Sequence, residues 1–96
     1  MWILDGRRPV QVTFFEWVAW AATVPADIGL VEKTELSEDV GVATTFCFST
    51  GRFETLTRSK TKVDDTGASY RTWDEATEGH ARAVEVAKAY AAWACN

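Results

Sequence analysis

One histidine and two cysteines are the residues of this sequence best suited to nucleophilic or metal chemistry: His80, Cys47 and Cys95. A single histidine excludes a metal site with two histidine ligands, and nucleophilic catalysis would need a thiol beside His80. Cys47 is expected in a strand and Cys95 after the last helix, and no signal in the sequence brings either thiol to His80. We predict that His80 is structural, held by a backbone or carboxylate partner, that both thiols are reduced, and that no residue is catalytic.

Carboxylates and glycines are the next candidates for chemistry. Asp64-Asp65 and Asp74-Glu75 carry oxygen ligands that suit Mg²⁺ or Ca²⁺. The spacing of a calcium-binding loop is missing, so a solvated loop and a helix cap are the favoured interpretation. The isolated glycines Gly51, Gly67 and Gly79 make no phosphate-binding pattern. We predict no metal, no cofactor and no enzymatic activity.

Basic side chains crowd one stretch of the chain, shortly after an acidic stretch. The basic stretch is the best candidate for contact with an anion or an acidic protein. A solvated sheet edge is the alternative, because lysines also protect edge strands against aggregation. The candidate binding residues here are Arg52, Arg58, Lys60 and Lys62.

Tryptophans supply the other candidate binding residues, because an exposed Trp often anchors a protein interface. Trp17 and Trp20 are three residues apart, so both can face one side of a helix, with the core as their favoured location. Trp93 belongs to the last turns of a helix long enough to extend past a sheet. Trp20 and Trp93 are therefore candidate contacts with a partner.

Composition and charge limit the class of protein. The 96 residues are 47% hydrophobic and 25% charged, which is ordinary for one globular domain. The net charge of −4 and the pI of about 4.9 argue against direct binding of nucleic acid, which favours a basic domain. The N-terminus lacks signal-peptide features, and the longest apolar stretch, Phe14 to Val24, is too short to span a bilayer. We expect a soluble, cytoplasmic protein without membrane contact.

A short helix and several strands are predicted from local signals. Thr13 and Glu16 form a capping box that opens a helix, which runs to about Thr23 and is stopped by Pro25. Alternating apolar residues between turn signals predict the strands. The expected strands cover residues 2–4, 9–12, a stretch from 28, 42–48, 52–58 and 70–71, with 59–69 a loop or hairpin tip.

A long amphipathic helix over residues 72–94 closes the chain. Thr72 and Glu75 form its capping box, and one apolar stripe runs along it. Gly79 lies inside this helix, where close packing against the sheet is its favoured explanation and a recognition surface is the alternative. The stripe consists of Trp73, Ala76, His80, Ala83, Val84, Ala87, Tyr90, Ala91 and Ala94.

Together these elements predict a single α+β domain over residues 1–96. Its small antiparallel sheet has about four to five strands. The sheet packs against the short N-terminal helix and the long C-terminal helix.

The order of these segments resembles a group of small uncharacterised proteins of bacteriophages and prophages. The most distinctive mark is the closing pattern YxTWxEAxxGH, which runs from Tyr70 to His80 here. An Asp-His pair and a Gly/Pro-rich loop that such proteins often carry after a strand are missing, and Phe48-Ser49-Thr50-Gly51 stands in their place. The resemblance implies a phage origin and no established activity.

A compact, acidic protein of such origin is expected to act by binding another protein. The sharpest form of this hypothesis is a non-enzymatic accessory protein that inhibits a bacterial defence system, in the manner of an anti-CRISPR protein, in the host cytoplasm. Its partner would be a host defence complex, and a homodimer is left open. The alternative is a minor virion or assembly component that acts through self-association.

Overall fold

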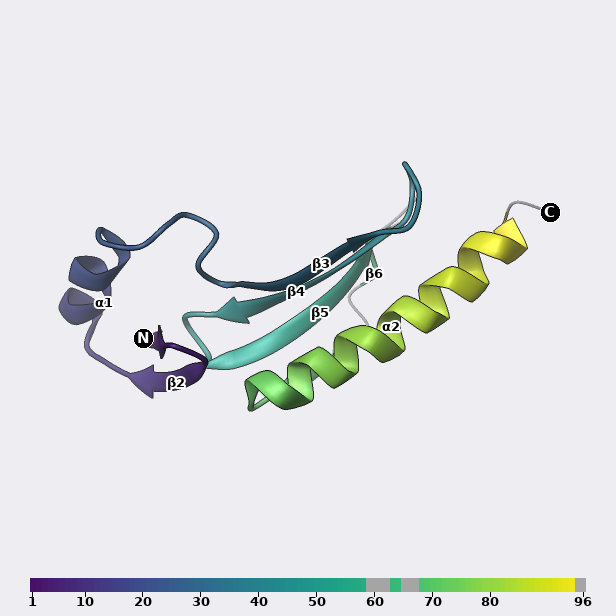
Figure 1. The fold of residues 1–96 in the computed structure, drawn as a ribbon. Helices are drawn as coiled ribbons and strands as arrows, with labels where there is room; N and C mark the ends of the chain where they lie inside the picture. The colour runs from purple at the N-terminus through teal and green to yellow at the C-terminus, as the bar shows by residue number, and fades with distance from the viewer. Residues whose placement is uncertain (59–62, 65–67, 95–96) are drawn as a thin grey trace.

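The computed structural model describes residues 1–58, 63–64 and 68–94, with side chains for residues 1–58 and 68–89. The chain forms the α+β fold that the sequence predicts, with a short first helix, a long last helix and antiparallel strands (Figure 1). The elements are β1 (Trp2–Asp5), β2 (Arg8–Gln11), α1 (Phe14–Ala21), β3 (Leu30–Glu35), β4 (Gly41–Cys47), β5 (Arg52–Arg58), β6 (Val63–Asp64), β7 (Ser69–Tyr70) and α2 (Trp73–Ala94).

The main sheet has the strand order β3-β4-β5-β6, with β7 also paired to β5, and every pairing is antiparallel. Its centre is the predicted hairpin of β4 and β5, which are rich in the β-branched and aromatic residues that favour strands. Strand β3 lies at an edge, and its register shifts between Leu30 and Glu32. Such a bulge, together with charged side chains, is a common protection of an exposed edge.

Helix α2 covers one face of this sheet, and the core lies between them (Figure 1). Alternate residues of β4 and β5 point to the helix because side chains alternate along a strand. Phe53, which is 0% exposed, is at the centre of the larger of two apolar clusters. The clusters contain Leu4, Phe46, Phe53 and Ala76 in one, and Val40, Val42 and Ala87 in the other.

The start of α2 has one half of the predicted capping box, since the Glu75 carboxylate accepts from the Thr72 hydroxyl and not from the Thr72 amide. The amide of Glu75 donates to the Thr72 hydroxyl at 3.1 Å, and that hydroxyl lies 3.2 Å from the Glu75 carboxylate. A Cβ placed on Gly79 would lie 2.1 Å from the Tyr70 ring, which confirms that this glycine allows the helix to approach the strands closely. Among the described side chains, the charged face of α2 is exposed.

The N-terminal hairpin of β1 and β2 forms a separate two-stranded sheet. It is joined to the main sheet at Trp2, whose amide donates to the Phe48 carbonyl at 2.7 Å. The Trp2 ring also lies directly against Gly51, in the turn between β4 and β5, where φ is +73°. The turn between β1 and β2 is formed by Gly6 and Arg7, with Gly6 at φ +64°.

Helix α1 begins with the complete capping box of Thr13 and Glu16 and ends at Ala21, two residues before the predicted end, with Ala22 as its C-cap. It lies at one end of an elongated molecule of 51 × 22 × 18 Å, beside the N-terminal hairpin (Figure 1). Its contacts with the sheet run through Trp17 and Trp20, both of which pack on Phe48. The helix therefore caps the end of the sheet rather than covering its face.

In the part of the chain that the structure describes, no helix is both long enough and apolar enough to cross a membrane.

Candidate protein-binding surface

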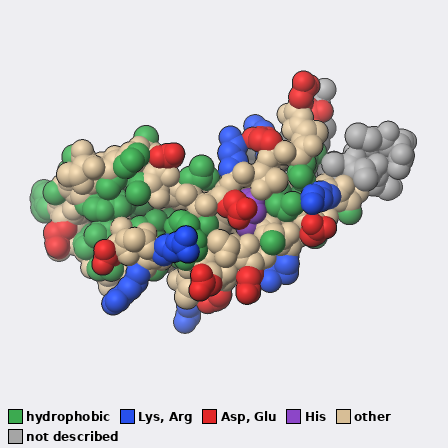
Figure 2. Space-filling view, viewed as in Figure 1, with side chains coloured by type: hydrophobic (Ala, Val, Ile, Leu, Met, Phe, Trp, Pro, Cys, Tyr) green, Lys and Arg blue, Asp and Glu red, His purple; other side chains and the backbone are tan. Residues whose placement is uncertain are grey.

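Three large apolar side chains of α1 are left in solvent, and we call them the apolar helix face: Phe14, Phe15 and Val18. They are 58%, 83% and 44% exposed. At 3.6 residues per turn they fall within about 100° of the helix circumference, so they form one surface. Figure 2 shows hydrophobic side chains gathered at this end of the molecule.

A row of aromatic rings connects the apolar helix face to Phe48, at the end of the main sheet. The Phe14 ring stacks on Trp17 with centroids 6.2 Å apart, and Trp17 packs on Phe48 at 6.0 Å. The capping box fixes the first turn, and the hydrogen bonds from the Thr13 backbone and side chain lower the pKa of Glu16. A helix already fixed in this way loses little conformational freedom on binding, which favours affinity.

The exposed area is large enough to matter for binding. At the exposures given above, the two phenylalanines leave roughly 250–300 Å² of side chain open, taking about 200 Å² per aromatic side chain. Complete burial of that area would contribute about 7 kcal/mol before the cost of association. Exposed apolar patches that approach a few hundred Å² on a small monomer often mark interaction sites.

The sequence did not point to Phe14, Phe15 and Val18 as binding residues, although it placed them in a helix with a broad apolar face. A signal was present, because Glu16 is the only charged residue among the eight of α1. A helix that is apolar nearly all round is buried or covered by a partner. No residue of α1 is buried, so the apolar face of this helix is not covered within the described chain.

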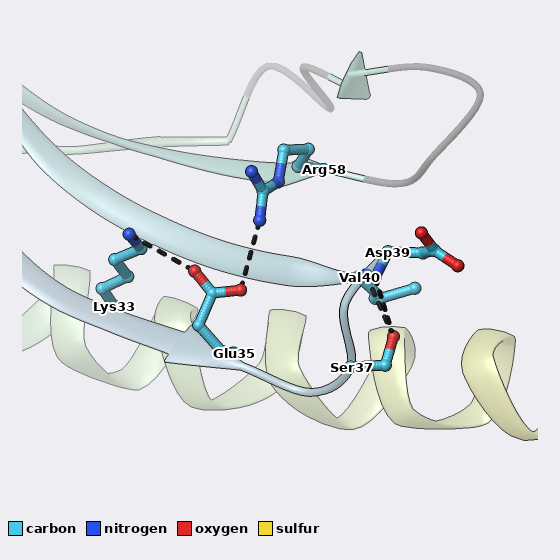
Figure 3. Close-up of polar contacts among 6 residues, drawn as sticks. All are labelled: Lys33, Glu35, Ser37, Asp39, Val40 and Arg58. Atoms are coloured by element: carbon cyan, nitrogen blue, oxygen red, sulfur yellow. Dashed lines mark hydrogen bonds and ion pairs between the residues drawn. The ribbon is translucent and has the colours of Figure 1, made fainter.

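The predicted basic patch is divided in the structure. Arg52 and Arg58 stand at opposite ends of β5, about 20 Å apart at the rise of a strand. Arg58 pairs with Glu35 at 3.2 Å, and Lys33 pairs with the other oxygen of the same carboxylate at 3.3 Å (Figure 3). Glu35 reaches Arg58 across Gly41, where a Cβ would lie 2.9 Å from the Glu35 oxygen.

This ion triplet balances part of the charge on which the sequence interpretation depended. Arg52 instead donates to the Ser69 hydroxyl at 3.3 Å. Lys60 and Lys62 lie outside the described residues. The structure therefore brings no two of the four predicted basic residues together within the part of the chain that it describes.

Of the two tryptophans predicted to contact a partner, only Trp20 has a described side chain. Trp20 is half-buried and meets Phe48 edge to face, with ring centroids 5.6 Å apart, so it attaches α1 to the core. Trp93 lies in the last turns of α2, and its side chain is outside the described residues.

His80 is buried, with 1% of its surface exposed, and both ring nitrogens have partners. Nε2 lies 2.9 Å from the Thr34 hydroxyl and Nδ1 lies 2.8 Å from the Thr44 hydroxyl, which in turn lies 2.7 Å from Thr55. The expected backbone or carboxylate partner was wrong, because two strands, β3 and β4, supply hydroxyls instead. A hydroxyl can donate or accept, so either neutral tautomer of His80 is satisfied.

We expect the stability of the protein to fall as the pH drops below about 6.5, the ordinary pKa of histidine. Burial lowers the pKa of His80, and the charge of Glu32 opposes the shift. The unfolded chain therefore takes up a proton before the folded chain does, so stability is complete above that pH and declines below it. Urea unfolding at about pH 7.5 and about pH 5.5 measures this loss.

The control for this prediction is His80→Gln, which lacks the titrating group. The difference in unfolding free energy between wild type and His80→Gln should shrink at the lower pH. Equal differences at the two pH values would show that another group causes the pH dependence.

No group of three or more His, Cys, Asp or Glu side chains that could hold a metal ion is found among the described residues. Asp65 and the side chain of Asp64 lie outside them, as does Cys95. Cys47 is half-buried at the end of β4, and hydrogen bonds from Ser49 and Thr50 lower the pKa of its thiol.

Comparison with known protein families, curated proteins and solved structures found no match to this chain.

Proposed function

We propose that this protein acts by binding another protein through the apolar helix face. The observation that carries the proposal is Phe15, the most exposed large apolar side chain described, on a helix with no buried residue. Its sharpest form is a phage-type accessory protein that inhibits a bacterial defence system in the host cytoplasm. The closing pattern from Tyr70 to His80 supports the phage-type origin.

The geometry of α1 suits insertion into an apolar groove. A protein groove that binds a helix contacts side chains spaced about one turn apart, and Phe14 and Val18 have this spacing. Phe15 stands beside them and widens the contact. A few such aromatic anchors supply most of the binding energy in typical interfaces.

Self-association is the second candidate function, as expected of a virion or assembly component. The same apolar helix face would then pack on a second copy. Light scattering at several concentrations separates the two. Stable higher oligomers would favour an assembly role over an inhibitor.

The test is protection of phage in bacterial strains that each carry one active defence system. Expression of the protein should raise the plating efficiency of a targeted phage in at least one strain. Phe15→Glu places a charge within the apolar contact and should weaken partner binding at least about 30-fold, abolishing protection. The fold should be unaffected, because an exposed position changes stability by about 0.5 kcal/mol or less.

The matched control is Val86→Glu, which adds the same charge at an apolar residue of α2 that is 72% exposed and outside α1. It should protect phage as the wild type does. Absence of protection in every strain, or equal protection by Phe15→Glu, would contradict the proposal.

A further inference from the structure

Four arginines from three separate parts of the chain meet around Pro9, and we call them the arginine cluster: Arg7, Arg8, Arg52 and Arg71. They line two hollows that share Pro9. Four of the ten basic residues thus gather at one place in a chain of net charge −4. Figure 2 shows basic side chains projecting from this part of the molecule, near β2 and the start of α2.

The first hollow lies between the N-terminal hairpin and the start of α2. Arg7 and Arg8 line it on one side, and Thr72, Trp73 and Asp74 line it on the other. The Arg7 guanidinium lies over the Trp73 ring, 5.2 Å from its centroid. Stacking on an aromatic ring orients a guanidinium and leaves its N–H groups free to bind in the ring plane.

The second hollow lies on the other side of Pro9. Arg52 and Arg71 line it together with Trp2 and the turn at Gly51. The Trp2 ring rests on Gly51, so one wall of this hollow is fixed by the fold. Arg52 uses one N–H group on Ser69, 3.3 Å away, which holds the side chain in place.

The arginine cluster keeps its charge available. Within the described part of the chain, none of the four arginines forms an ion pair with a carboxylate within 4 Å. The contrast is Arg58, which Glu35 neutralises at 3.2 Å. Planar guanidinium groups match the geometry of carboxylates and phosphates, to which they bind through two parallel hydrogen bonds.

We propose that the arginine cluster is a second binding site, which takes the carboxylates of an acidic segment of a protein. An acidic protein suits the site better than a nucleic acid for two reasons. A nucleic-acid duplex would extend past the hollows over the rest of a chain of net charge −4, which repels it, whereas a short acidic segment needs to contact only the arginines. Asp74 also lines the first hollow, which disfavours a continuous track of phosphates.

The site deepens the proposed function and rests on it in one respect: the acidic segment belongs to the partner that covers α1. Helix α1 and the N-terminal hairpin occupy the same end of the molecule (Figure 1). One partner can therefore cover both surfaces, with an apolar groove for Phe14, Phe15 and Val18 and acidic side chains for the arginines.

The experiment uses the full chain and a fluorescein-labelled oligoglutamate peptide at low salt, read by fluorescence anisotropy. Arg7→Gln/Arg71→Gln removes one arginine from each hollow and should weaken peptide binding about tenfold. Tryptophan emission should change on binding, since Trp2 and Trp73 line the hollows. Added salt should weaken the complex.

The matched control is Arg82→Gln/Lys88→Gln, which removes the same charge from the exposed face of α2. It should bind the peptide within about twofold of wild type, because these residues lie outside the two hollows. Absence of peptide binding at low salt, or equal weakening by the control, would overturn the site. Tighter binding of a DNA duplex of equal charge, lost in Arg7→Gln/Arg71→Gln, would assign it to phosphates instead.

The Phe15→Glu variant separates this site from the proposed function. It should bind oligoglutamate as the wild type does, because Phe15 lines neither hollow. The peptide measurement therefore tests the arginine cluster, and the plating assay tests the apolar helix face.

Discussion

Replacing His80 with alanine should destabilise the fold by about 3–5 kcal/mol, the cost of deleting a large buried side chain. The imidazole is fully enclosed between α2 and the central strands. Its removal leaves a cavity and takes the imidazole partner from the Thr34 hydroxyl, while the Thr44 hydroxyl keeps Thr55. An unpaired buried polar group costs about 1–3 kcal/mol. Because a small domain has only about 5–15 kcal/mol of stability, the variant should be partly unfolded at moderate temperature.

Urea unfolding followed by tryptophan fluorescence measures this loss, with Val86→Ala as the control on an exposed position of the same helix. The control should change stability by about 0.5 kcal/mol or less. A His80→Ala variant that kept the wild-type melting temperature but lost phage protection would show that the histidine serves function and not structure.

Replacing Gly51 with alanine should cost about 2–5 kcal/mol, from two separate causes. The backbone at Gly51 has φ +73°, a conformation in which L-residues are strained. The new Cβ would also lie 2.4 Å from the Trp2 ring, so the ring would have to leave its place. Since Trp2 joins the N-terminal hairpin to the main sheet, the hairpin and the second hollow of the arginine cluster should loosen together.

Gly6 provides the control that separates the two causes. It has φ +64°, but a Cβ placed there meets nothing within 4 Å. Gly6→Ala should therefore cost only the backbone strain, about 1–2 kcal/mol. Chemical denaturation of both variants measures the difference between their unfolding free energies. Equal losses of stability would show that the Trp2 contact does not contribute to the cost at Gly51.

The elements that the sequence predicts correctly are those with signals inside one segment. Thr13 with Glu16 and Thr72 with Glu75 mark helix starts because a capping box is a local hydrogen-bond pattern. The strands β4 and β5 follow from alternation and from a Gly-containing turn. Each of these depends on neighbours a few residues away, so no knowledge of the tertiary structure is needed.

The candidate sites could not be predicted in the same way, because each depends on distant segments. His80 meets hydroxyls from β3 and β4, and Thr55 of β5 extends the chain of contacts. The alternation of side chains along each strand does not predict that these threonines lie together beside one helix residue. The arginine cluster likewise joins Arg7, Arg8, Arg52 and Arg71 from three separate segments. The sequence singles out only Arg52 among them, and it groups Arg52 with Arg58, Lys60 and Lys62 instead.

Helix α1 illustrates a third limit. Its apolar residues predict a helix whose surface is covered by other residues. The sequence does not say which residues cover it. The prediction that Trp17 and Trp20 face one side is consistent with their shared contact with Phe48. Which face stays open is decided by where the helix sits relative to the sheet, and that is a tertiary property.

The contact of Trp17 and Trp20 with Phe48 also bears on how the protein is made. Phe48 leaves the ribosome 31 residues after Trp17. At about 5–20 residues per second, this delay lasts about 1.5–6 s. During that interval α1 has neither its ring partner nor the sheet behind it, so all of its aromatic side chains are open to solvent. Chaperone supply and elongation speed should therefore govern the yield of soluble protein, and slow translation between the two positions should lower it.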